Sequence, residues 1–368
     1  MKNKHQIEVP YSVESWLPLS ASATFFLSAF TLALLLFGAQ AFARDSDGRL
    51  ALIRYPISSQ PEFARAGEQI TVDVSQSLYD SCPDALRAYL EKDGSLTPLE
   101  PAARLTGLAT GTYRFALPIP QKTAPGAYGI IAKKCAGAED SAKRSVVVVD
   151  AYPDEYSILH ITDIHVGRMN ADGPVGASTF ERMREMSNAA RPALVIITGD
   201  LSDTSNPEEL KKFIEILEGF DAPTFVVAGN HDRNNSDADS FIGPVRYSFN
   251  FGKHFFLGFD TQYEFPPPDP DNQMNWIKKE TRARAAAPFK VLFSHRADSD
   301  FRFVITKVVM PYKVNLLLLG HKHSDEVEKL GASYVVTTNA AVDGFYRVIR
   351  VKDNAVVDLP QMNLDGGK

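Results

Sequence analysis

Side chains that could bind metal ions recur where predicted buried strands end. Five of the eight histidines lie in such segments, together with aspartates and an asparagine. The segments are Thr-Asp-Ile-His at 162–165, Thr-Gly-Asp at 198–200, Ala-Gly-Asn-His-Asp at 228–232, Ser-His at 294–295 and Gly-His-Lys-His at 320–323. Open α/β sheets place their sites where strands emerge into loops, so we expect these side chains to meet. Imidazole, carboxylate and amide groups without a thiolate suit Fe, Mn or Zn in a catalytic site better than a structural zinc site.

Each segment alone is weak evidence, because carboxylates and amides at strand ends are often caps or turn residues. A single histidine is often a core residue whose ring nitrogens are hydrogen-bonded, or a surface residue. The recurrence of these residue types in five segments, each at a predicted strand end, nevertheless favours a metal site over separate structural roles. Outside the segments, His160 is predicted to be structural and His254 to be an exposed residue at a strand start.

The series of segments resembles the five-block signature of the calcineurin-like metallophosphoesterases over residues 155–350. The resemblance implies two divalent or trivalent metal ions (Mn, Fe or Zn) and cleavage of a phosphoester bond by in-line attack of a metal-bridging hydroxide. Asp200 would bridge the two ions. The implied ligands are Asp163, His165, Asp200 and His323 for the first ion, and Asp200, Asn230, His295 and His321 for the second.

Two catalytic residues follow from the same resemblance. His231 matches a histidine that does not bind metal but assists the leaving group as a general acid. Asp203 matches a carboxylate that pairs with this histidine, and such a partner would fix the ring tautomer and support the protonated form. Arginines that closely follow ligand segments are expected either to bind phosphate or to be solvated surface residues. They are Arg168, Arg233 and Arg296.

The class of phosphoester depends on a shorter pattern. Gly-Asp-Leu-Ser-Asp and Gly-Asn-His-Asp, with Gln273–Ile277 at a predicted helix start, resemble the cyclic-nucleotide phosphodiesterase-like branch, so a phosphodiesterase is favoured. The alternatives are an extracytoplasmic phosphomonoesterase and a non-catalytic surface-binding protein with a vestigial enzyme domain. A net charge of −6 argues against general nucleic-acid binding, and the expected partner is a small phosphoester substrate. The oligomeric state stays open.

The elements that carry these segments predict an α/β domain over residues 151–368. Continuous apolar runs alternate with helical patterns, which indicates strands covered on both faces. We therefore expect a two-sheet metallophosphoesterase sandwich flanked by helices. The Pro-rich stretch 265–272 is predicted to be a loop. The predicted helices are 205–219, capped by Ser205 or Asn206, a second that follows Ser178 or Thr179, and a third over 272–287.

A small all-β sandwich is predicted to precede this domain, over residues 44–150. Short alternating runs separated by Gly and Pro are typical of such strands. The segment resembles the immunoglobulin-like modules that precede some exported phosphoesterases. We expect it to pack against the enzyme or to help place substrate.

The first 43 residues predict a signal peptide or a membrane anchor. Between Glu14 and Arg44 no residue is charged, and small residues that suit cleavage follow the apolar centre. Either alternative places the remaining chain outside the cytoplasm, periplasmic or secreted, with membrane contact only through the leader. In such a compartment Cys82 and Cys135 are expected to form a disulfide, the alternative being two buried thiols.

Overall fold

The computed structural model describes residues 44–75, 87–100, 104–105, 111–133, 139–233, 238–260, 273–297 and 302–366. These residues belong to one compact unit that spans Ala41–Lys368. The leader, both cysteines and the Pro-rich stretch lie outside the described residues, so what we expect of them stays a prediction. Among the helices of the described ranges, none is long and apolar enough to cross a membrane.

The N-terminal part consists of two β-sheets around one core. Along β3, Ile70, Val72 and Val74 are buried, and they alternate with residues on the opposite face. One sheet has the order β1 (Ile53–Tyr55), β3 (Gln69–Ser75), β7 (Thr112–Pro118) and β6 (Arg104–Leu105). The other has the order β2 (Glu62–Ala64), β9 (Glu139–Val148), β8 (Gly126–Lys133), β4 (Arg87–Lys92) and β5 (Ser95–Leu99).

The C-terminal part has two larger sheets. In the first, β10, β11 and β12 run parallel. In the second, β14, β15, β16 and β18 run parallel. The first sheet has the order β12 (Thr224–Val227), β11 (Leu194–Thr198), β10 (Glu155–Ile161), β19 (Phe345–Lys352) and β20 (Ala355–Asp358), with β21 (Gln361–Asn363) paired to β19. The second has the order β13 (Tyr247–Phe251), β14 (His254–Gly258), β15 (Lys290–Phe293), β16 (Leu316–Leu319), β18 (Ser333–Thr337) and β17 (Glu326–Leu330).

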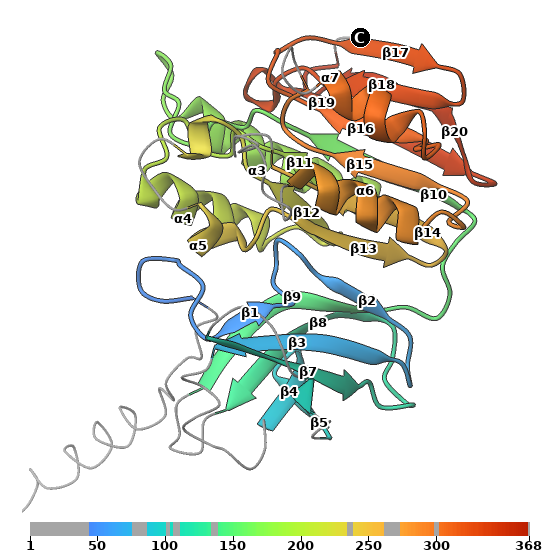
Figure 1. The fold of residues 1–368 in the computed structure, drawn as a ribbon. Coiled ribbons are helices and arrows are strands. Elements are labelled where there is room, and N and C mark those ends of the chain that lie inside the picture. The colour runs from blue at the N-terminus through green and yellow to red at the C-terminus, as the bar shows by residue number, and fades with distance from the viewer. Residues whose placement is uncertain are drawn as a thin grey trace, which may run out of the picture. The chain divides into compact units, whose positions relative to one another are not determined.

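Both faces of these sheets are covered, and this explains the continuous apolar runs of the sequence. Along β11, Leu194 and Ile196 pack between the two sheets, whereas Val195 and Ile197 pack under helices. Figure 1 displays the helices on the outer faces of the sheets. The predicted fold class, a two-sheet α/β sandwich preceded by an all-β part, is confirmed.

The helices lie close to the predicted positions, with differences at the end of α6, which ends at Ala283 rather than at 287, and at the start of α3. This helix starts at Val175, before the predicted caps, because the chain turns at Pro174 without a side-chain cap. Asn206 caps α4 as predicted, since its side chain accepts a hydrogen bond from the backbone N–H of Glu208. The α-helices are α3 (Val175–Ala190), α4 (Pro207–Leu217), α5 (Asp239–Ile242), α6 (Gln273–Ala283) and α7 (Arg302–Val304). Other turns are 3-10 helical at His231–Arg233 and Ala341–Asp343, and π-helical at Ile305–Val309.

Candidate metal centre

All seven predicted ligands meet in one region, in the loops that follow five strands of both sheets. The side chains of Asp163, His165 and His323 offer ligand atoms that lie within 4.8 Å of one another. Those of Asp200, His295 and His321 form a second such group. The groups adjoin, because Asp200 Oδ2 lies 3.9 Å from His165 Nε2 and 3.3 Å from His295 Nε2. The seventh residue, Asn230, has its Oδ1 3.1 Å from His295 Nε2.

The loops reach this arrangement with unusual backbone angles. Five of the predicted ligands have a positive φ, although none is glycine, and they are Asp163, His165, Asp200, His321 and His323. Such conformations are uncommon and concentrate at functional sites. Close packing adds to the constraint. A side chain at Gly320 would place its Cβ 1.8 Å from Thr162 Oγ1, so only glycine allows the loop after β16 to approach the loop after β10.

Buried polar atoms without partners indicate that these residues fit metal ions. Asp163 Oδ2 accepts hydrogen bonds from Thr162 Oγ1 at 2.8 Å and from the backbone N–H of His321 at 2.9 Å. Asp163 Oδ1 and both ring nitrogens of His165 are buried without a hydrogen-bond partner. His323 Nε2 is close enough to Asp163 Oδ1, at 3.2 Å, for an ion pair but lacks hydrogen-bond alignment. Each buried polar atom without a hydrogen-bond partner lowers the stability of the fold by about 1–3 kcal/mol, and a bound cation would give these atoms a partner.

The backbone of β11 fixes the tautomer of His295. Its Nδ1 lies 2.7 Å from the carbonyl oxygen of Thr198, which can only accept a hydrogen bond, so Nδ1 carries the hydrogen. Nε2 is therefore the ring nitrogen that lies near Asp200 Oδ2, at 3.3 Å, and Asn230 Oδ1, at 3.1 Å, and that a bound metal ion would take. Outer-shell partners of this kind orient histidine ligands in metal sites.

The carboxylates of the centre are held in their charged form. Burial raises the pKa of Asp200, but hydrogen bonding and charge interaction with His295 outweigh it and lower the pKa to about 2. Burial lowers the pKa of His295, and the neighbouring Asp200 outweighs that effect and raises the pKa to about 9. For Asp163, burial is likewise outweighed, chiefly by His323, and its pKa is lowered. Two buried carboxylates ringed by imidazoles form an electrostatic site suited to cations.

The contact between His231 and Asp203 differs from the expected carboxylate pair. His231 Nδ1 lies 2.6 Å from the backbone carbonyl oxygen of Asp203, whereas the carboxylate Oδ1 of Asp203 lies 3.1 Å from Nδ1 of His165. The loop causes this: the backbone N–H of Thr204, which shares a peptide group with the carbonyl of Asp203, donates to Glu209 Oε2 at 2.9 Å and so orients that carbonyl. Nδ1 of His231 thus carries a hydrogen, and its Nε2 is the ring nitrogen that could exchange a proton with a substrate.

A positioning residue that the sequence analysis assigned no role is Asp232. It is fully buried and accepts hydrogen bonds from the backbone N–H groups of Gly229 at 2.7 Å, Ser202 at 2.9 Å and Leu201 at 3.2 Å. These contacts join the loop of Asp200 to the loop of Asn230. The only sequence signal was its place at the end of Gly-Asn-His-Asp.

Two of the histidines that the structure describes lie outside the centre. His160 is structural as predicted: it is buried between Thr338 Oγ1 and Thr198 Oγ1, each at 2.8 Å. His254 begins β14 as predicted, but the expectation that it is exposed is wrong. Its ring is buried between the hydroxyl of Tyr156 at 2.7 Å and Asn354 Oδ1 at 2.9 Å, partners that are distant in sequence.

The three arginines near the ligand segments have different surroundings. Arg233 forms ion pairs with Asp260 at 2.6 Å and Asp239 at 2.9 Å. The side chain of Arg168 is 43% exposed and lies 3.9 Å from Asp203. Arg296 lines a depression of about 440 Å³ that begins at the predicted ligand His321. Ile305, Leu319 and Val335 give this depression an apolar lining, and Lys322, Glu326 and Glu328 give it charged groups.

Comparison with known proteins agrees with this architecture. Residues 156–325, which hold every predicted ligand, match the calcineurin-like phosphoesterase family. A Caenorhabditis elegans protein named as a metallophosphoesterase is 24% identical over 205 residues, 52% of this chain and 41% of that protein. The 3′,5′-cyclic adenosine monophosphate phosphodiesterase CpdA of Haemophilus influenzae is 23% identical over 223 residues, 54% of this chain and 80% of that protein. The chain thus matches less than half the length of the worm relative.

A solved structure extends the likeness in fold. The purple acid phosphatase PPD1 from yellow lupin seeds aligns with a TM-score of 0.52 at 16% identity, covering 82% of this chain and 71% of that one. This coverage exceeds what residues 151–368 alone could supply, so the similarity includes part of the N-terminal sheets.

Proposed function

We propose that this chain, which carries a calcineurin-like metallophosphoesterase domain at residues 156–325, hydrolyses small phosphodiesters with the help of two bound metal ions. One observation carries the proposal: seven residues with oxygen or nitrogen ligand atoms converge from the loops of two sheets, and two of them, Asp163 and His165, have buried atoms without a hydrogen-bond partner. Such atoms would be costly in a purely structural site. The proposal includes export from the cytoplasm, on the apolar leader of residues 1–43.

The donors divide into two neighbouring sets with Asp200 between them. Asp163, His165 and His323 would hold one ion, and Asn230, His295 and His321 the other. Bound there, two cations would lower the pKa of a coordinated water and neutralise charge on the phosphoryl oxygens.

His231 is the group of this chain best placed to move a proton. Its Nδ1 hydrogen is bound by the carbonyl of Asp203, and its backbone N–H donates to Asp200 Oδ1 at 2.9 Å. These two bonds fix the ring beside the ligands, and Nε2 can then donate a proton to the departing alkoxide. General acids of this kind contribute about 10²–10⁴-fold to a rate.

The depression at His321 supports a diester substrate. A phosphomonoester needs room only for a phosphoryl group and one substituent, whereas a diester carries a second. The apolar lining and the charged rim at Arg296 and Lys322 would accept such a substituent next to the phosphorus.

Activity of the full chain tests the proposal. The protein is stripped with a chelator, reloaded with Mn²⁺ and assayed on bis-p-nitrophenyl phosphate, p-nitrophenyl phosphate and 3′,5′-cyclic AMP. We expect preference for diesters, about two metal ions per chain, and loss of both metal and turnover in Asp200→Asn. His231→Ala should keep the metal and lose more turnover on cyclic AMP, whose leaving group is an alkoxide, than on the p-nitrophenyl ester. The matched control is Asp221→Asn, a side chain that is 68% exposed.

The alternatives give different results in the same assay. Preference for the monoester would replace the diesterase by a phosphomonoesterase. No turnover together with no retained metal would indicate a non-catalytic binding protein. Equal effects of His231→Ala on both diesters would contradict its role as general acid.

A further inference from the structure

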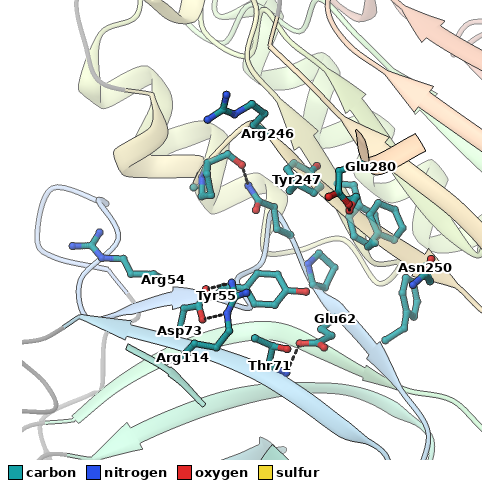
Figure 2. A pocket seen from close by; sticks show the side chains of 18 of the residues that line it. Arg54, Tyr55, Glu62, Thr71, Asp73, Arg114, Arg246, Tyr247, Asn250 and Glu280 are labelled. Carbon is teal, nitrogen blue, oxygen red and sulfur yellow. Dashed lines mark hydrogen bonds and ion pairs between the residues drawn. The ribbon is translucent and has the colours of Figure 1, made fainter. Parts of the chain in front are cut away.

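A second cavity lies away from the metal centre, between the N-terminal sheets and the phosphoesterase domain. It measures about 950 Å³. Figure 2 views it from close by, with Tyr55, Glu62 and Asp73 on one side and Tyr247 and Glu280 on the other. Ligand pockets commonly have such a size and lie where two parts of a protein meet.

Hydrogen bonds and rings fix the two parts beside this cavity. The backbone N–H of Val226 donates to Ser59 O at 3.1 Å, and Gln60 Nε2 donates to the carbonyl oxygens of Ile242 at 3.0 Å and Pro244 at 2.7 Å. The ring of Phe63 packs against Phe225, Phe249 and Phe251 with centroid distances of 5.1–6.4 Å. The cavity is therefore part of an ordered interface that side chains do not fill.

The wall formed by the N-terminal sheet is polar. Because Ile70, Val72 and Val74 point into the core, the alternating residues Thr71 and Asp73 point into the cavity. Asp73 binds Arg114 through two hydrogen bonds of 2.7 Å.

Glu62 adds a carboxyl group to the same wall and accepts a hydrogen bond from the N–H of Thr71 at 2.8 Å. A sheet face that served only for packing would be apolar. This face instead presents hydrogen-bonding groups held in place by one another.

The opposite wall is aromatic and rigid. The hydroxyl of Tyr247 donates to Val226 O at 3.0 Å, which fixes the ring. Phe249 stacks on Phe225 with an interplanar angle of 7°. Trp276 of α6 lines the cavity half-buried, and the guanidinium of Arg246 lies 5.9 Å from the centre of its ring.

The lining holds four arginines and four carboxyl groups, and one of these carboxyl groups, Glu62, differs from the other three. The Asp73–Arg114 pair is neutralised internally, so it offers hydrogen-bonding groups without net charge. Burial raises the pKa of Glu62 to about 8, so this carboxyl group is protonated at neutral pH and can donate a hydrogen bond. On the polar wall the guanidinium of Arg114 is already bound by Asp73, so it is not available to hold a phosphate as a bidentate partner, whereas the pair and the Glu62 carboxyl group can still bond to hydroxyl groups of a neutral ligand.

We propose that this cavity binds a neutral polyhydroxylated ligand, a sugar or short oligosaccharide. The aromatic wall packs against the C–H face of a sugar ring, and the polar wall binds its hydroxyl groups. This binding is separate from the phosphoesterase reaction, because none of the predicted metal ligands lines the cavity.

Tryptophan fluorescence can test the proposal directly. The chain has two tryptophans, Trp16 and Trp276, so in the full chain with Trp16→Phe all tryptophan emission comes from the cavity wall. Neutral trisaccharides built from glucose, N-acetylglucosamine, mannose and galactose are titrated, with inorganic phosphate as the anionic comparison. We expect a saturable change in emission with at least one trisaccharide and none with phosphate.

Variants of the polar wall complete the test. Asp73→Asn should weaken binding about tenfold or more, because it breaks a bidentate pair that holds the wall. The matched control is Asp358→Asn, whose carboxylate pairs with Arg350 at the surface. Should Asp73→Asn fail to fold, Asn250→Ala removes an exposed polar side chain that lines the opposite wall, and it should also weaken binding. Hydrolysis of the p-nitrophenyl diester should be equal in all of these variants.

Three results would overturn the proposal. They are no response to any of the trisaccharides, saturation of the same signal by inorganic phosphate, and equal affinity in the wall variants and the Asp358→Asn control. A protein that binds sugar but hydrolyses no phosphoester would contradict only the proposed function.

Discussion

Asp232 connects two loops that carry predicted metal ligands, although it is not a predicted ligand itself. Its carboxylate accepts hydrogen bonds from the backbone of Gly229 on one loop and of Leu201 and Ser202 on the other. Asp200 and Asn230 lie in these same loops. The distance between the two predicted ligands therefore depends on a buried residue that is not itself a predicted ligand.

Replacement of Asp232 by alanine should destabilise the protein and loosen the centre. The change leaves three buried backbone N–H groups without acceptors, so we expect a loss of about 3 kcal/mol or more in the free energy of unfolding. Metal affinity should fall about 10–100-fold, as for other outer-shell contacts. Urea denaturation and chelator competition measure the two effects. Asp221→Ala, at the surface, is the control, and an equal denaturation midpoint in both variants would disprove the structural role.

At the scale of elements, α4 holds the loop after β11 against the first sheet. Its buried face, Leu210, Phe213, Ile214 and Leu217, packs in the core under that sheet. Glu209 in its first turn accepts hydrogen bonds from the backbone N–H groups of Asp203 at 3.1 Å and Thr204 at 2.9 Å. The start of the helix thus helps to orient the carbonyl that binds His231.

The N-cap of α4 should contribute measurably to stability. Asn206→Ala removes the acceptor of the Glu208 N–H, which lies 3.0 Å from Asn206 Oδ1, and should cost about 1 kcal/mol of unfolding free energy. Asn206→Asp keeps an acceptor and should restore most of it. Thermal and urea unfolding of the three proteins give the comparison. Alanine and aspartate variants of equal stability would mean that Pro207 and the buried face alone fix the helix start.

The same elements explain what the sequence could predict. The metal ligands could be predicted because each lies in a short segment directly after a strong apolar strand pattern. Helix α4 could be predicted because its cap, its proline and its apolar spacing all indicate a helix at the same place. The burial of His254 could not be predicted from the sequence, since it depends on Tyr156 and Asn354, which are 98 and 100 residues away. The contact of His231 with the backbone carbonyl of Asp203 could not be predicted either, because it depends on the backbone conformation of a loop and not on a residue type.

At the scale of the whole molecule, the two parts meet through an interface that includes charged and aromatic groups. A cavity with one polar and one aromatic wall could not be predicted from either segment alone, because each wall follows an ordinary pattern of its own strand or helix. Its clearest physical signature is Glu62. This carboxyl group lies near Tyr55, Asp73 and Arg114 on the wall formed by the N-terminal sheets.

Glu62 should make stability depend on pH in a defined direction. Burial raises its pKa from 4.5 to about 8, so between these values the folded protein binds more protons at this site than the unfolded chain. The stabilisation from this group is complete below about pH 4.5 and is lost as pH rises through about 8. Glu62→Gln cannot lose a proton. The free energy of unfolding of Glu62→Gln, minus that of the unmodified protein, should therefore increase with pH between about 4.5 and 8. The increase should be at most about 1.4 kcal/mol per pH unit.

Comparing the two proteins at each pH isolates this group, because Tyr55, Asp73, Arg114, Tyr247, Arg246 and Glu280 around the cavity are unchanged. Urea denaturation from pH 5 to 9 measures the difference, and the exposed Glu100→Gln provides the matched control. A constant difference across the window would mean that Glu62 ionises normally and that water fills this side of the cavity. A difference that grows with pH would place a protonated carboxyl group on the polar wall at neutral pH, where it can donate to a hydroxyl of a bound ligand.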